Sequence, residues 1–306
     1  MEETGEGIAF RKFTPSQLRK WRTLDGVLYG RALATTGIRL DFHTDSEVME
    51  LACAGGGKFE IWVDGLLRYA FDADETPVFR APLSLPFTGR ERDCRVTVYF
   101  PAHDHAGMLK RLSLDDGAYV RAHRFDRKIL FMGDSITQGW AAEHDSLSYA
   151  NRVSRAFNAE SVVQGVGGSC FCPEIPEPLP FDPDWIIVAY GTNDFTACTE
   201  VEKFRETLDA YLSGLKVLYP QKAIFVISPI WREKTESKCG LDFAGWRQLI
   251  ADTAERYGFV PVDGARLVPP VRDFYHDSLH PNDSGFAFYA ENLTEFLKKY
   301  KKIPER

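Results

Sequence analysis

The first part of the chain alternates between apolar and polar residues. From about residue 20 to residue 125 apolar side chains recur at every second position, as in Ile38, Leu40 and Phe42, in Phe59, Ile61 and Val63, and in Val96, Val98 and Phe100. Alternation of this kind is typical of strands with one buried face. Asp64-Gly65 and Asp116-Gly117 stand where hairpin turns would be needed. No long helical pattern interrupts the strands, so residues 1–125 are predicted to form an all-β domain, a sandwich or jelly roll.

In the second part of the chain the apolar residues are spaced differently. Short, continuous apolar runs occur at residues 129–132, 161–163, 185–190, 223–227 and 260–262. Residues 201–218, 246–257 and 286–297 instead carry apolar side chains at helical spacing. Strands buried on both faces that alternate with amphipathic helices predict a parallel sheet covered on both sides. Residues 126–306 are therefore predicted to form a three-layer α/β/α domain of the flavodoxin-like type, with ligands bound beyond the carboxyl ends of the strands.

The composition and charge of the chain argue against some classes of binding partner. The chain has 306 residues, of which 44% are hydrophobic and 26% charged, enough for a large core. A net charge of −7 argues against nucleic acid or an anionic membrane as the main partner. The one cationic run, Lys298, Lys299, Lys301 and Lys302, is expected to complement a helix dipole. Residues 1–11 lack the apolar core of a signal peptide, and no run could span a bilayer, which favours a cytoplasmic protein.

Three glycine-containing motifs follow the first three apolar runs. Gly133-Asp134-Ser135 follows the first run, residues 165–168 (Gly-Val-Gly-Gly) follow the second, and residues 191–194 (Gly-Thr-Asn-Asp) follow the third. A serine on a tight turn after a buried strand has its hydroxyl lifted out of the sheet, where a nucleophile belongs. Residues 277–280 (Asp-Ser-Leu-His) lie in a loop before the last helical segment, and that loop can return a histidine to the same edge of the sheet.

These residue types suit acyl transfer. A serine hydroxyl needs a neighbouring base, for which His280 is the candidate, and Asp277 can hold the second ring nitrogen. The Ser135 and Gly168 amides and the Asn193 side chain would then meet the negative oxygen of the intermediate. Simpler interpretations stay open: Ser135 as a helix cap, Asn193 and Asp194 as turn formers, the glycines as turn residues, and His276 as a competing base.

The four motifs, in this order, resemble the SGNH (GDSL-type) hydrolase superfamily over roughly residues 128–300. The resemblance maps the four name-giving residues to Ser135, Gly168, Asn193 and His280, and its Asp-x-x-His-Pro pattern selects His280 over His276. The family commonly has an asparagine where this chain has Gln164, so the anchoring of the glycine loop is expected to differ. No metal and no cofactor are implied.

A β-sandwich ahead of such a domain resembles carbohydrate esterase family 2, with Gly30-Arg31 and Val63-Asp64-Gly65 as weak matching features. That resemblance implies removal of acetyl groups from small-molecule or oligosaccharide esters. Aromatic side chains that could stack on a sugar, each with core packing as the alternative, are Trp140, Phe171, Phe195 and Trp231. A thioesterase or lysophospholipase activity, and a non-catalytic carbohydrate-binding module with a vestigial site, are the competing hypotheses.

Two further clusters have ordinary interpretations. Cys170 and Cys172, beside the glycine loop, are expected to be structural, with a redox or metal role as the alternative. His103 and His105 flank Asp104, which could form a metal site, although a solvated loop is favoured.

Overall fold

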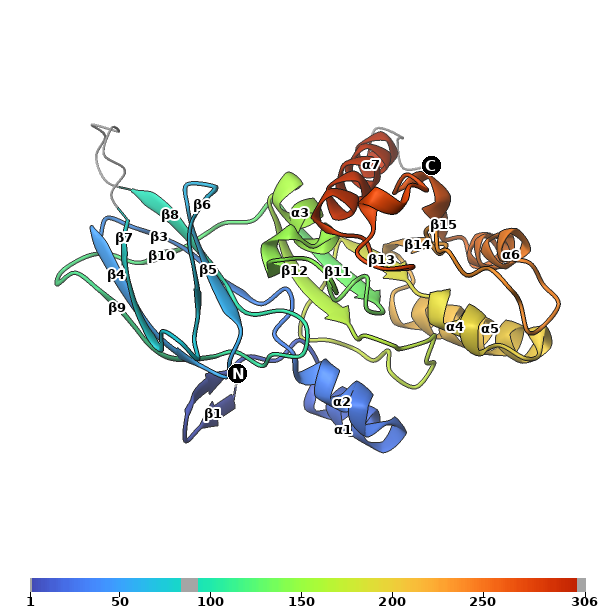
Figure 1. Cartoon of the computed structure of the whole chain (residues 1–306), viewed down its shortest axis with the longest axis horizontal. Helices are drawn as coiled ribbons and strands as arrows, with labels where there is room; N and C mark the ends of the chain where they lie inside the picture. The colour runs from blue at the N-terminus through green and yellow to red at the C-terminus, as the bar shows by residue number, and fades with distance from the viewer. Residues whose placement is uncertain (1, 84–92, 302–306) are drawn as a thin grey trace.

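The computed structural model describes residues 2–83 and 93–301, and within them the strands form three five-stranded sheets (Figure 1). Two sheets are antiparallel and come from the first part of the chain. The third is parallel and comes from the second part. Lys302 of the cationic run lies outside the described residues. None of the helices in the described ranges combines the length and the apolar character that a membrane crossing requires.

The two antiparallel sheets share one apolar core. The strands of the first, in spatial order, are β1 (Glu2–Thr4), β2 (Gly7–Ala9), β9 (Met108–Leu114), β4 (Val48–Ala54) and β7 (Val78–Pro82). Those of the second are β10 (Arg121–Ala122), β3 (Arg39–Thr44), β8 (Cys94–Tyr99), β5 (Lys58–Val63) and β6 (Leu66–Asp72). Alternate residues of β5 and β8 enter the core, as the sequence pattern predicts. The jelly-roll topology and a domain boundary at residues 125/126 stay predictions.

Two helices correct the all-β prediction for the first part of the chain. Helix α1 (Pro15–Leu24) begins with a capping box, in which the Thr14 side chain and the Gln17 side chain each bond the other's backbone. Helix α2 (Gly26–Leu33) is capped by Asp25, whose carboxylate accepts two backbone N–H groups. The pair packs against the second half of the chain through Trp21, Val166 and Ile175.

The two predicted hairpin turns have different outcomes. Asp64-Gly65 joins the paired strands β5 and β6, so that prediction is confirmed. Asp116-Gly117 follows β9, but β9 and the next strand, β10, belong to different sheets. The second turn therefore connects a strand of one sheet to a strand of the other. The alternation of apolar residues within a strand does not indicate to which sheet the strand belongs.

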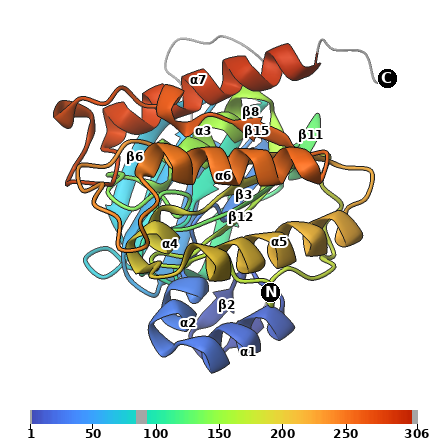
Figure 2. The ribbon, with the colours of Figure 1, turned by 90° about the vertical axis from the view of Figure 1, so that its right-hand side faces the viewer.

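The parallel sheet confirms the predicted α/β architecture. Its spatial order is β12 (Ala159–Gly165), β11 (Arg127–Gly133), β13 (Trp185–Ala189), β14 (Ala223–Ile227) and β15 (Val260–Val262). Helices α3 (Tyr149–Ala156) and α7 (Asp283–Lys301) cover one face, and α5 (Val201–Leu218) and α6 (Phe243–Arg256) cover the other (Figure 2). Ile129 and Phe131 of β11 enter the first core, and Leu130 and Met132 enter the second. The remaining short helices are α4 (Thr192–Ala197), η1 (Asp145–Leu147), η2 (Gly264–Arg266) and η3 (Arg272–Phe274).

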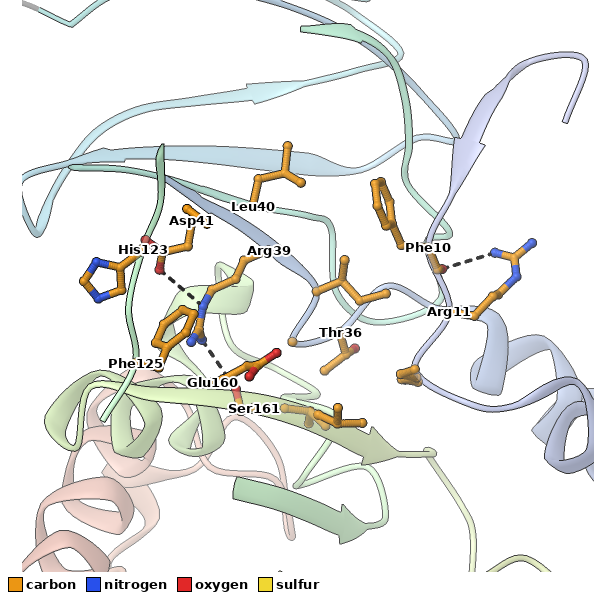
Figure 3. A pocket seen from close by; sticks show the side chains of 16 residues that line it. Phe10, Arg11, Thr36, Arg39, Leu40, Asp41, His123, Phe125, Glu160 and Ser161 are labelled. Atoms are coloured by element: carbon orange, nitrogen blue, oxygen red, sulfur yellow. Dashed lines mark hydrogen bonds and ion pairs between the residues drawn. The ribbon is translucent and has the colours of Figure 1, made fainter. Parts of the chain in front are cut away.

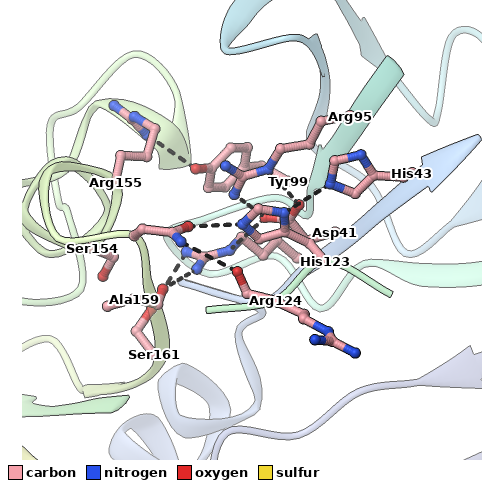
Figure 4. A network of polar contacts seen from close by, with 12 residues as sticks. Asp41, His43, Arg95, Tyr99, His123, Arg124, Ser154, Arg155, Ala159 and Ser161 are labelled. Atoms are coloured by element: carbon pink, nitrogen blue, oxygen red, sulfur yellow. Dashed lines mark hydrogen bonds and ion pairs between the residues drawn. The ribbon is translucent and has the colours of Figure 1, made fainter. Parts of the chain in front are cut away.

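Polar side chains join the antiparallel sheets to the parallel sheet (Figure 4). Arg39 of β3 donates to the Ala159 carbonyl oxygen of β12 at 2.5 Å, and its partner Asp41 also accepts two hydrogen bonds from Arg95, at 2.8 and 2.7 Å. A pocket of about 510 Å³ lies beside Arg39 at this junction (Figure 3). None of the predicted site residues lines it.

Glu60 of β5 forms a second polar link across the junction. Its carboxyl group is fully buried and accepts hydrogen bonds from the Ser146 N–H at 3.0 Å, the Ser146 hydroxyl at 2.5 Å and the Trp62 indole at 3.1 Å. A buried carboxyl group is tolerated only where such donors surround it.

Glu60→Ala should lower the free energy of unfolding by about 2–4 kcal/mol, because it leaves buried donors without an acceptor. Urea denaturation of the whole chain measures the effect. The matched control is Glu143→Ala, whose side chain is 63% exposed and whose loss should change stability by less than about 0.5 kcal/mol. Equal effects of the two substitutions would contradict the assigned role of Glu60.

Candidate active site

A steric constraint shapes the turn that carries Ser135. At Gly133, the last residue of β11, an added Cβ would lie 2.0 Å from Thr137 Oγ1 and 2.6 Å from the Ala189 carbonyl oxygen, so only glycine fits. The Asp134 carboxyl group accepts the Ile136 N–H at 2.9 Å and closes the turn. Ser135 is therefore presented just beyond the carboxyl end of the strand, and its 6% exposure leaves it at the edge of the protein interior.

The structure brings Ser135, His280 and Asp277 together. Ser135 Oγ lies 2.9 Å from His280 Nε2, and His280 Nδ1 lies 2.8 Å from Asp277 Oδ2. The other carboxylate oxygen of Asp277 accepts the N–H groups of Leu279 and His280, at 2.8 and 2.7 Å. With Nδ1 donating to Asp277, the Nε2 atom is free to accept from the serine hydroxyl. His276 is exposed, and the contact to Ser135 is made by His280, as the sequence pattern predicts.

Asp277 remains a carboxylate at neutral pH. Partial burial favours its protonated form, but hydrogen bonds from the His280 N–H, the His280 ring and the Leu279 N–H outweigh burial and lower the pKa of Asp277. The imidazole of His280 therefore faces a negative charge on one side and a neutral hydroxyl on the other.

The loops after β12 and β13 meet beside Ser135. Gly168 is exposed and left-handed, with a φ of 82°, which favours glycine. The Asn193 side-chain amide donates to the Ser169 carbonyl oxygen at 3.0 Å, and Asp194 accepts the Phe171 N–H at 3.0 Å. Within residues 2–83 and 93–301 the N–H groups of Ser135 and Gly168 donate to no other group. Both donors are thus available to a ligand.

The four predicted aromatic residues have different surroundings. The Trp140 ring is half-buried, with its centroid 6.3 Å from that of His280 and 5.6 Å from that of His103. Phe171 and Phe195 are only 3% and 1% exposed and pack among other aromatic rings of the α5–α6 core, which favours the alternative of core packing over contact with a sugar. Trp231 is half-buried and packs on Tyr275, with centroids 4.6 Å apart, against the core that α3 and α7 cover.

Two residues that sequence reasoning did not assign to the site touch the glycine loop. Arg31 of α2 donates to the Gly167 carbonyl oxygen at 2.9 Å, and Gln138 accepts the Gly167 N–H at 2.5 Å. The sequence marks Arg31 only as part of the weak Gly30-Arg31 match to carbohydrate esterase family 2. Gln164, where the family commonly has asparagine, anchors the glycine loop to the N-terminal part of the chain. Its side-chain amide donates to the Lys12 carbonyl oxygen and to the Gln17 side chain, at 2.9 and 3.1 Å.

The cysteine and histidine clusters are not arranged as metal sites. Among the described residues no group of three or more His, Cys, Asp or Glu side chains is placed to hold a metal ion. All six cysteines are free thiols, and burial raises the pKa of Cys172, which donates to Glu174 at 3.0 Å, to about 12. His103 differs from the predicted solvated loop, because its ring packs beside Trp140.

Comparison with solved structures shows the same fold along nearly the whole chain. A salicylyl-acyltransferase from a tetracycline biosynthetic pathway superposes with a TM-score of 0.79 at 19% identity, over 97% of this chain and 92% of that chain. A carbohydrate esterase family 2 enzyme with a carbohydrate-binding domain, from Corynascus thermopiles (Myceliophthora fergusii), gives 0.70 at 17% identity, over 86% and 93%. A family two carbohydrate esterase from Clostridium thermocellum, in complex with cellohexaose, gives 0.63 at 19% identity, over 86% and 91%.

No curated protein matches the sequence significantly. The model of the GDSL-like lipase/acylhydrolase family matches residues 131–288, slightly more than half of the chain. That span contains the serine turn, both glycine-containing loops that follow it and the Asp277–His280 loop. The chain therefore belongs to the GDSL-like lipase/acylhydrolase family, the SGNH hydrolases.

Proposed function

We propose that the protein is a serine esterase that removes short acyl groups, acetyl above all, from carbohydrate esters. The observation that carries the proposal is the continuous contact from Ser135 through His280 to Asp277, at 2.9 and 2.8 Å. Nucleophile, base and orienting carboxylate are already within hydrogen-bond distance of one another. A vestigial site in a binding module would not need this alignment.

The reaction begins when Ser135 Oγ attacks the ester carbonyl carbon and His280 Nε2 takes the hydroxyl proton. Asp277 stabilises the imidazolium that forms. The N–H groups of Ser135 and Gly168, with the Asn193 amide, bind the negative oxygen of the tetrahedral intermediate. The intermediate then expels the alcohol, which takes the proton from His280 and leaves the acyl group on Ser135. Water, deprotonated by His280, releases the acid by the same steps in reverse.

The buried carboxyl groups of Asp134 and Asp194 close turns, whereas the side-chain contact of the Ser135 hydroxyl is with His280. Burial raises the pKa of Asp134 and that of Asp194 to about 7, and each accepts a backbone N–H group, from Ile136 and Phe171 respectively. The carboxylate that contacts the imidazole is that of Asp277, whose pKa is lowered, so Asp277 supplies the negative charge that the imidazolium requires.

The side chains around Ser135 favour a polar alcohol and a short acyl group. Trp140 offers a flat ring beside His280, and the polar side chains of Arg31 and Asn193 bond the glycine loop at Gly167 and Ser169. A sugar can stack on the ring and bond the polar groups, and carbohydrate esterases of family 2 share the fold. Transfer of the acyl group to an alcohol, the activity named for the salicylyl-acyltransferase, would use the same acyl-enzyme.

Ser135→Ala should lower turnover of p-nitrophenyl acetate by about 10⁴-fold or more, because the acyl-enzyme can no longer form. Ser213→Ala, on the remote helix α5, is the matched control and should keep the wild-type rate. Unchanged far-ultraviolet circular dichroism would show that both variants fold. An active Ser135→Ala variant would refute the mechanism.

Acetyl esters should react far faster than long-chain esters, because an acetylesterase gains no binding energy from a longer alkyl chain that it does not bury. Comparing kcat/KM for p-nitrophenyl acetate and octanoate, and for acetylated oligosaccharides, tests this expectation. Comparable values for acetate and octanoate would point instead to a thioesterase or lysophospholipase. An acetylated product formed with added alcohol would identify acyl transfer.

Asp134→Asn should change how stability depends on pH. The pKa of Asp134 in the folded protein lies above its unfolded value near 4, so on raising the pH the unfolded chain loses the proton first. The wild type should therefore lose stability relative to the variant between about pH 4 and pH 7, by at most about 1.4 kcal/mol per pH unit, and no further above that window.

Urea denaturation across this pH range measures the difference. Asp252→Asn, an exposed position on α6, is the control and should follow the wild type. Parallel stability curves for the wild type and Asp134→Asn would contradict a buried, protonated Asp134.

A further inference from the structure

The peptide that joins Gly167 to Gly168 is held by a residue from the N-terminal part of the chain, far away in sequence. Arg31 Nη1 donates to the Gly167 carbonyl oxygen at 2.9 Å across 136 residues of sequence. Arg31 lies on α2, well outside the span that matches the family model. The N–H on the other side of this peptide belongs to Gly168, the proposed oxyanion donor.

The geometry of a trans peptide links these two groups. Its carbonyl oxygen and its N–H point in opposite directions within one plane, so fixing one fixes the other. The loop is also close to both Arg31 and the nucleophile, since a Cβ added at Gly167 would lie 3.4 Å from Arg31 Cδ and 3.6 Å from Ser135 Cβ. When the carbonyl oxygen turns toward the guanidinium, the Gly168 N–H faces away from it.

A second contact restrains the preceding peptide. The Gly167 N–H donates to Gln138 Oε1, and Gln138 Nε2 donates to the His103 carbonyl oxygen, both at 2.5 Å. His103 adopts a φ of 61°, which is unusual for a residue with a side chain and persists only where the surroundings enforce it. Both peptides of Gly167 are therefore held by the first 125 residues of the chain, one directly and one through Gln138.

Arg31 is itself fixed in place. Its Nε lies 3.7 Å from Asp104 Oδ1, and the carbon of its guanidinium lies 5.6 Å from the centre of the Trp140 ring. The side chain is 30% exposed, so its charge is only partly screened by water. A planar group held by a carboxylate, an aromatic face and a carbonyl oxygen has one preferred orientation, which lysine could reproduce only in part.

We propose that Arg31 is a positioning residue for the oxyanion donor: by holding the Gly167 carbonyl oxygen, it orients the Gly168 N–H toward the oxygen that becomes negative in the transition state. The inference rests on the proposed esterase function. If Arg31 has this role, the first part of the chain contributes a residue to the geometry of the active site.

Arg31→Ala should lower kcat for p-nitrophenyl acetate about 10- to 100-fold and change KM by less than about threefold, because the donor acts in the transition state. Arg31→Lys should retain an intermediate rate, and millimolar guanidinium chloride should restore part of the activity of Arg31→Ala. The matched control is Arg22→Ala on α1, whose guanidinium packs over Tyr29 and which should keep the wild-type kcat.

A kcat of Arg31→Ala within about twofold of the wild type would overturn the inference, as would an equal loss in Arg22→Ala. If Arg31→Ala fails to fold, Arg31→Gln is measured in its place and judged by the same split between kcat and KM. Failure of the proposed esterase function would give a different result. The wild type itself would neither hydrolyse p-nitrophenyl acetate nor react at Ser135 with diethyl p-nitrophenyl phosphate. That result would also overturn the role inferred for Arg31.

Discussion

Parallel pairing of β11 with both β12 and β13 is the constraint on which the whole site depends. The register places Gly133 opposite Gly165 on one side and opposite Ala189 on the other, so three strands end at one level. Ser135, Gly168 and Asn193 follow two, three and four residues beyond those aligned positions. The chain adds β12 on one side of β11 and β13 on the other, so the topological switch point, where ligands bind in sheets of this kind, lies between β11 and β13. A slip of either pairing would separate the serine from its proposed oxyanion donors.

Elements with a clear hydrophobic pattern, either a continuous apolar run or an apolar helical face, could be predicted from the sequence. The apolar runs at residues 223–227 and 260–262 coincide with β14 and β15, and the helical face that begins at Val201 coincides with α5. Helices α1 and α2 escaped prediction because little of either is buried, Gln17 and Trp21 in α1 and Ala32 in α2. Their start signals, the Thr14 capping box and the Asp25 cap, were nevertheless present in the sequence.

In the site, too, the residues in local sequence motifs could be predicted, whereas a residue that acts through a long-range contact could not. Motif order predicted that these residues come together, because three of the four motifs begin where a buried strand ends. Neighbourhood in sequence was a poor guide for Phe171 and Phe195, since a residue just after a strand can turn into the core as easily as toward a ligand. Arg31 could not be placed at all, because its contact with Gly167 depends on how helix α2 packs against a loop formed much later in the chain.

The contacts of residues 12–31 with the glycine loop also bear on the biosynthesis of the protein. Lys12, Gln17 and Arg31 leave the ribosome long before their partners at residues 164–167 exist, and His280 follows only near the end of translation. Until then the indole of Trp21 lacks its final packing partners Val166 and Ile175. During translation helices α1 and α2 therefore cannot yet make these tertiary contacts. The chain has a complete set of site residues only when almost all of the polypeptide has emerged.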